Sequence, residues 1–75
     1  MFTLQIAYSW GDKEEKLEFD TRLETWETAK RMAMAEADTA SEESVRPVSM
    51  IVDKSKLEII LTYPNDRSEC RYTVL

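Results

Sequence analysis

The chain has 75 residues and a formal net charge of −5, with no histidine, one cysteine and one glycine. A chain of this length forms one domain, over residues 1–75, and buries only about 60% of the surface that its unfolded form exposes. The apolar content and the regular alternation described below argue against disorder, and no apolar run approaches the roughly 20 residues of a membrane span.

The acidic residues concentrate in the first part of the chain. Residues 1–44 contain eleven Asp or Glu against five Lys or Arg, whereas residues 45–75 contain four against five. Phosphate repels such a chain, so direct binding to nucleic acid or to an anionic membrane is disfavoured. We expect a cytoplasmic protein, because Met1 leads into strand-like sequence rather than a signal peptide and one cysteine cannot form an internal disulfide.

Two strands are predicted before residue 21. Apolar side chains recur at every second position of the first strand, as is typical of a half-buried strand: Phe2, Leu4, Ile6, Tyr8 and Trp10. Gly11 and Asp12 break this alternation with turn chemistry, and the charged residues 12–15 follow. Leu17 and Phe19 then alternate with polar residues, which predicts a hairpin partner for the first strand.

One helix is predicted, over Thr25–Thr39, and its start has two interpretations. In the first, Thr21 and Leu23 continue the second strand, Thr25 is the N-cap, and Glu27 lies in the first turn near the positive end of the helix dipole. In the second, Thr21 caps the helix with Glu24 three residues later, a capping box. The first interpretation is favoured.

The predicted helix has one apolar face made almost entirely of alanine. Its members are Trp26, Ala29, Ala33, Ala37 and Ala40. Small side chains allow the helix backbone to approach a sheet closely, with Trp26 as the large anchor. On another face, Glu27 and Arg31 are spaced for an i,i+4 ion pair.

Three more strands are predicted after the polar linker Ser41–Ser44. The alternating runs are Val48–Val52, Leu57–Tyr63 and Cys70–Val74, separated by turns at Asp53–Ser55 and Pro64–Asp66. Pro47 indicates a strand beginning or a sheet edge. The order ββαβββ predicts a two-layer α+β domain, in which one helix packs on one face of a four- or five-stranded antiparallel sheet.

No residue pattern points to catalysis, a cofactor or a metal site. The carboxylates fall in turns or on outward faces, where solvated side chains are the rule. Cys70 occupies an inward position of its strand and has no histidine as a base, so we interpret it as a small buried hydrophobe. Zinc has too few of its preferred ligands, and no loop has calcium-binding spacing.

Two features indicate protein binding. The acidic residues Glu14, Glu15 and Glu18, together with Glu27, form a surface that can steer toward a basic partner. In addition, a single helix covers only one face of the sheet, so Ile51 and Ile60 are predicted to form an apolar patch on the other face. Such a patch suits a protein partner or a homodimer.

The segment at residues 25–33, TWETAKRMA, set between two strands and three, resembles part of some small phage-encoded anti-CRISPR proteins. The resemblance implies a ββαβββ domain that acts without catalysis, by binding a CRISPR effector complex and blocking its access to DNA. The sequence therefore predicts a non-enzymatic protein-binding module, most specifically a phage or mobile-element inhibitor of a nucleic-acid-handling complex. The alternative is a small homo-oligomeric structural or accessory domain.

Overall fold

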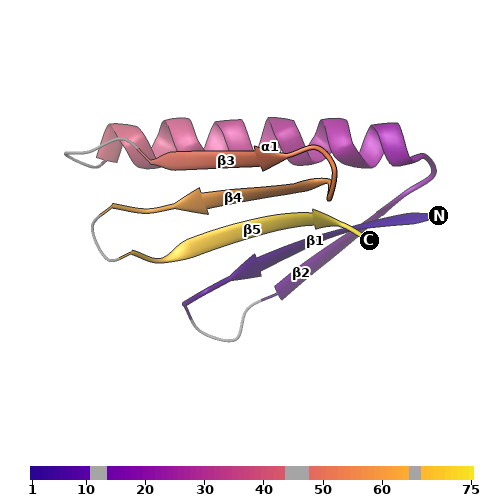
Figure 1. Ribbon diagram of the computed structural model, residues 1–75, viewed down its shortest axis with the longest axis horizontal. Coiled ribbons are helices and arrows are strands. Elements are labelled where there is room, and N and C mark those ends of the chain that lie inside the picture. Colours follow the sequence, from indigo (N-terminus) through magenta and orange to yellow (C-terminus); the bar gives the residue numbers. More distant parts are fainter. Residues whose placement is uncertain (11–13, 44–47, 65–66) are drawn as a thin grey trace.

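The computed structural model describes residues 1–10, 14–43, 48–64 and 67–75. The elements follow the predicted order: β1 (Phe2–Tyr8), β2 (Glu14–Phe19), α1 (Arg22–Glu43), β3 (Ser49–Asp53), β4 (Glu58–Thr62) and β5 (Glu69–Val74). All five strands form one antiparallel sheet in the order β2-β1-β5-β4-β3, and α1 packs on one of its faces (Figure 1). The predicted α+β fold is therefore confirmed, with β2 and β3 as the two edges.

The hydrophobic core lies between α1 and the three central strands. Its fully or almost fully buried members come from alternate positions of β1, β4 and β5 and from one face of α1: Leu4, Ile6, Ile59, Leu61, Cys70, Tyr72, Ala29 and Ala33. The period-two alternation of the strands places these side chains under the helix. Alanine at the helix contact allows the close approach that the sequence predicted.

The prediction that Thr25 caps the helix was wrong, and Thr21 is the N-cap. The Glu24 amide donates a hydrogen bond to Thr21 Oγ1 at 3.1 Å, which satisfies one of the first amides of the helix. Thr25 lies one turn further on, fully buried, and its hydroxyl donates to the Thr21 carbonyl oxygen at 2.7 Å. Leu23, predicted as an inward strand residue, is 68% exposed on the first turn.

The helix also ends later than predicted. It runs to Glu43 rather than to Thr39, so residues 41–43 of the predicted linker are helical, while Ser44 lies outside the described residues. Alanine and glutamate favour helix and no Gly or Pro stops it there. Ser41 then helps to place the next strand, because its Oγ accepts a hydrogen bond from the Val48 amide at 3.1 Å.

A compact turn joins β3 to β4 as predicted. The Asp53 carboxylate accepts hydrogen bonds from the Ser55 amide at 3.0 Å, the Ser55 hydroxyl at 2.7 Å and the Lys56 amide at 3.2 Å. Leu57 closes the turn with a φ of 51°, in the left-handed region. The predicted turns at Gly11-Asp12 and Asn65-Asp66, and Pro47, lie outside the described residues.

Candidate functional site

The two edges of the sheet differ in chemistry. Edge strand β2 carries Glu14, Glu15 and Glu18, all exposed, and these three residues are the acidic edge. Glu15 lies opposite the buried Ile6 and so points to the helix side of the sheet, whereas Glu14 and Glu18 point to the opposite, open face. Glu14 pairs with Lys16 at 3.5 Å. Both side chains are exposed, so this ion pair is weak.

The predicted isoleucine patch is present at the other edge. Ile51 of β3 and Ile60 of β4 are directly opposite each other in the strand register. Both side chains point to the open face, because their neighbours Ile59 and Leu61 are buried under the helix. Ile51 is largely exposed and Ile60 is half-buried.

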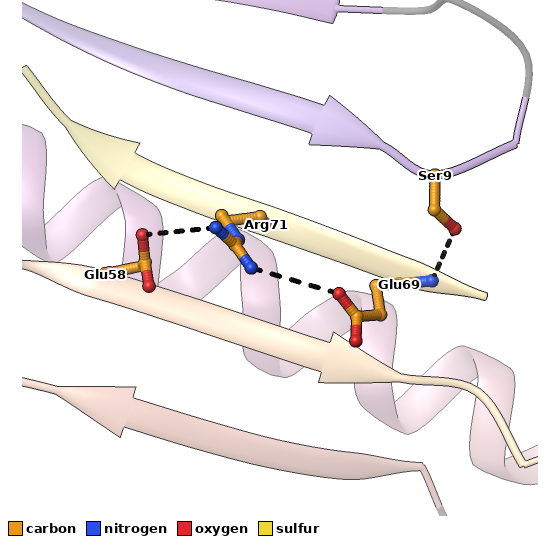
Figure 2. A network of polar contacts seen from close by, with 4 residues as sticks. All are labelled: Ser9, Glu58, Glu69 and Arg71. Atoms are coloured by element: carbon orange, nitrogen blue, oxygen red, sulfur yellow. Dashed lines mark hydrogen bonds and ion pairs between the residues drawn. The ribbon is translucent and has the colours of Figure 1, made fainter. Parts of the chain in front are cut away.

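An arginine lies between these two groups on the open face. Arg71 of β5 reaches Glu58 at 3.9 Å with Nη1 and Glu69 at 4.0 Å with Nη2 (Figure 2). The Glu69 amide donates a hydrogen bond to Ser9 Oγ at 2.7 Å, which ties β5 to the end of β1. The middle of the open face is therefore polar.

The six predicted partner-binding residues do not form one surface. Strands β1, β5 and β4 separate the acidic edge from Ile51, although Ile60 lies one strand nearer. Glu27 lies on α1, on the other side of the sheet, and its carboxylate pairs with Lys30 at 2.9 Å rather than with Arg31 as predicted. The first helical turn contains Glu24 instead of Glu27.

An aromatic cluster of Tyr8, Trp10 and Tyr63 lies at the end of the sheet where β1 and β4 finish. The ring centroids of Tyr8 and Trp10 are 5.1 Å apart at an interplanar angle of 50°. Those of Trp10 and Tyr63 are 5.4 Å apart at 73°, an edge-to-face contact. Trp10 remains 43% exposed, so the aromatic cluster presents part of its surface to solvent.

Two carboxylates flank the aromatic cluster. The Tyr63 hydroxyl donates a hydrogen bond to Glu36 Oε1 at 2.9 Å. Burial raises the pKa of Tyr8, and the negative charges of Glu15 and Glu36 raise this pKa further. Burial and the hydrogen bond to Glu36 likewise raise the pKa of Tyr63. Within the described residues, neither Glu15 nor Glu36 forms an ion pair with a basic side chain.

Glu36 was missed at the sequence level. Its only signal is its position four residues after Met32, which packs against the core, so that Glu36 borders the buried face of α1. Its partner Tyr63 is 27 residues away along the chain, and no local pattern connects the two.

Cys70 has the environment of a structural residue. Its side chain is fully buried, and this burial raises the pKa of the thiol. A raised pKa leaves little thiolate at neutral pH, and the thiolate is the nucleophilic form.

The other features of the described residues concern a metal site, a groove and a membrane span. No three acidic or thiol side chains among them come together to hold a metal ion. A shallow apolar groove lies at the start of α1, lined by Arg22, Leu23, Trp26 and Leu57. In the part of the chain that the structure describes, the one long helix is too polar to cross a membrane.

No protein-family model, curated protein or solved structure matches the chain.

Proposed function

We propose that this domain is a non-enzymatic protein-binding module that holds a basic segment of another protein. The observation that carries the proposal is the partly exposed aromatic cluster with Glu15 and Glu36 beside it. Aromatic faces attract ammonium and guanidinium groups, and adjacent carboxylates add to the attraction. Tyrosine and tryptophan are also the side chains that most often dominate the affinity of protein interfaces.

The acidic edge reaches this cluster through Glu15 and extends the negative surface away from it. Glu15 belongs to both features, since it lies on β2 and its charge acts on the Tyr8 hydroxyl. Glu14 and Glu18 continue the charge along the strand toward the open face. Exposed charges of this kind accelerate association with an oppositely charged partner more than they tighten the complex.

In its most specific form, the module is a cytoplasmic inhibitor from a phage or mobile element, aimed at a nucleic-acid-handling complex. Such complexes present arginine and lysine to phosphate, and a strand of carboxylates can occupy those side chains in place of nucleic acid. The resemblance of residues 25–33 to anti-CRISPR proteins supports this form. The burial of Cys70 supports a mechanism without a nucleophile.

The test is a tagged pull-down from a bacterial lysate that contains CRISPR effectors, at low and at high salt, read by mass spectrometry. We expect a stoichiometric nucleic-acid-binding protein at low salt that is lost at high salt, because salt screens exposed charges. The double variant Glu15→Lys, Glu36→Lys is expected to lose this protein, and so is Trp10→Ala.

The matched control is Asp38→Lys, Glu42→Lys, which makes the same change in net charge at two exposed helix positions. This control is expected to retain the captured protein. Recovery of the bait alone, or equal loss in both double variants, contradicts the proposal.

A further inference from the structure

Strand β3 is an edge strand with apolar side chains on both of its faces. Met50, Ile51 and Val52 are 41%, 59% and 39% exposed. Met50 and Val52 point to the helix side, as their predicted alternation requires, but α1 packs mainly against the other four strands and leaves them uncovered. An edge strand also has backbone amides and carbonyls on its outer side that another strand can pair with.

The two edges of the sheet contrast in how they resist such pairing. Edge strand β2 has four charged residues among its six, which is a common protection against strand addition. In β3 the one charged residue is Asp53, and the turn that follows engages its carboxylate. Strand β3 therefore lacks the protection that β2 has.

We propose that β3 pairs antiparallel with β3 of a second copy of this chain, about a two-fold axis at Ile51. The strand sequence is self-complementary in this register. Met50 lies opposite Val52 of the second copy, Ile51 opposite its own equivalent, and Ser49 opposite Asp53. Apolar residues thus meet apolar residues, and a hydroxyl donor meets a carboxylate.

The register within each copy extends this match beyond the edge strands. Ile60 is opposite Ile51, so the pairing produces a row of four isoleucines across the open face. On the helix side, Leu61 is opposite Met50 and Ile59 is opposite Val52, which gives two further apolar rows. The apolar patch that each copy exposes is completed by the same patch of the other.

The distribution of charge favours this contact over others between two acidic chains. Strand β3 contains one charged residue, Asp53, whereas β2 contains three glutamates and one lysine, so the β3 edge carries the smaller negative charge. The acidic edge at β2 lies at the far side of the sheet, beyond the other four strands. Two copies therefore meet through their least repulsive edges and keep their acidic edges apart.

The expected dimer is weak. A strand of five residues buries less than the roughly 800 Å² per partner that stable interfaces bury. We therefore expect a dimer that forms with rising protein concentration and dissociates on dilution. The inference does not depend on the proposed binding of a basic partner, because it uses the opposite edge of the sheet.

The first test is sedimentation velocity over a concentration series, with two lysine variants. Ile51→Lys places two positive charges directly opposite each other in the dimer. It is expected to raise the dissociation constant of the dimer roughly tenfold or more. Leu75→Lys is the matched control, because Leu75 is also 59% exposed but lies beside β1, where its amide donates to the Thr3 carbonyl oxygen. It is expected to dimerise like the wild type. A wild type that stays monomeric, or equal weakening by both variants, overturns the proposal.

The second test examines the register and does not depend on the folding of the Ile51 variant. Ser49 is exposed, and in the proposed dimer it faces Asp53 of the second copy. Ser49→Lys is expected to tighten the dimer roughly fivefold and Ser49→Glu to weaken it by a similar factor, since two symmetric charge pairs change at once. Leu75→Lys and Leu75→Glu are the matched controls, because they add the same charges to the chain outside the proposed interface. Equal responses at positions 49 and 75 overturn the proposed register.

Discussion

The Tyr63 hydroxyl donates a hydrogen bond to Glu36 Oε1 at 2.9 Å and joins the end of β4 to the second half of α1. It holds Tyr63 at the border of the aromatic cluster. The contact is exposed, so we expect Tyr63→Phe to lower the free energy of unfolding by only about 0.5–1 kcal/mol, measured by urea denaturation.

Glu36→Gln is the companion variant, because it keeps an acceptor oxygen and removes the charge. It is expected to destabilise the domain less than Tyr63→Phe while weakening the binding of a basic partner. The opposite order of the two unfolding free energies contradicts a structural role for this hydrogen bond.

The N-cap predicts a second result. Thr21→Ala removes the acceptor of the Glu24 amide and is expected to cost about 1 kcal/mol of unfolding free energy. Thr21→Ser retains the hydroxyl and is expected to cost much less. Helix content by circular dichroism and thermal unfolding give the comparison, and equal losses for the two variants exclude a capping role.

The contact between α1 and the sheet predicts a third result. Ala33 is fully buried on the face of α1 that packs on the sheet, so Ala33→Leu inserts a side chain that has no room and should destabilise the domain by about 1–3 kcal/mol. Ala35→Leu makes the same substitution at an exposed position two residues further on. It is expected to be near neutral in chemical denaturation. If Ala35→Leu destabilises the domain and Ala33→Leu does not, the face of α1 that packs on the sheet has been assigned wrongly.

The turn after β3 predicts a pH effect. The hydrogen bond from the Ser55 hydroxyl, helped by the Lys56 amide, holds the pKa of Asp53 below its usual value of 3.8. A carboxyl whose pKa is lower in the folded state contributes stability above its unfolded pKa, and this contribution is lost as the pH falls through the folded pKa. The loss therefore lies below pH 3.8.

A carboxyl titration of Asp53 by NMR, in the wild type and in Ser55→Ala, measures this effect. The variant is expected to show a pKa that moves up toward the usual value, because it lacks the hydroxyl donor. An unchanged pKa in the variant contradicts the role assigned to Ser55.

The burial of Cys70 predicts its reactivity. Because burial raises the pKa of the thiol and closes it to solvent, a chromogenic disulfide reagent is expected to react with Cys70 only after unfolding. Stopped-flow absorbance in native buffer and in concentrated denaturant provides the two rates. Fast labelling in native buffer contradicts a purely structural role.

Strand positions and element order could be predicted from the sequence because period-two alternation is a local property. The alternation of Leu4 and Ile6, and of Ile59 and Leu61, predicts burial that the structure confirms. Met50 in β3 has the same kind of alternation and is nevertheless exposed. Its exposure depends on the lateral order of the strands and on where the helix crosses them, which no short segment encodes.

The helix start and the candidate surfaces show the same limit. Both Thr21 and Thr25 are good capping residues, and only the structure shows that the Glu24 amide donates to Thr21. The acidic edge was visible as a run of charge. The association of Tyr63 with Glu36, and the separation of Ile51 from the acidic edge, arise from tertiary structure.

The position of β5 has a consequence for how the chain folds. Among the described residues β5 follows the other five elements in sequence, yet it is the central strand of the sheet and pairs with β1 on one side and with β4 on the other (Figure 1). Without β5, the strands reduce to two separate hairpins, β1–β2 and β3–β4. The two hairpins therefore share one continuous core only when β5 pairs with both of them. Pairings between segments far apart in sequence, such as β1 with β5, slow folding, and the facing edges of β1 and β4 stay open to other strands until β5 docks.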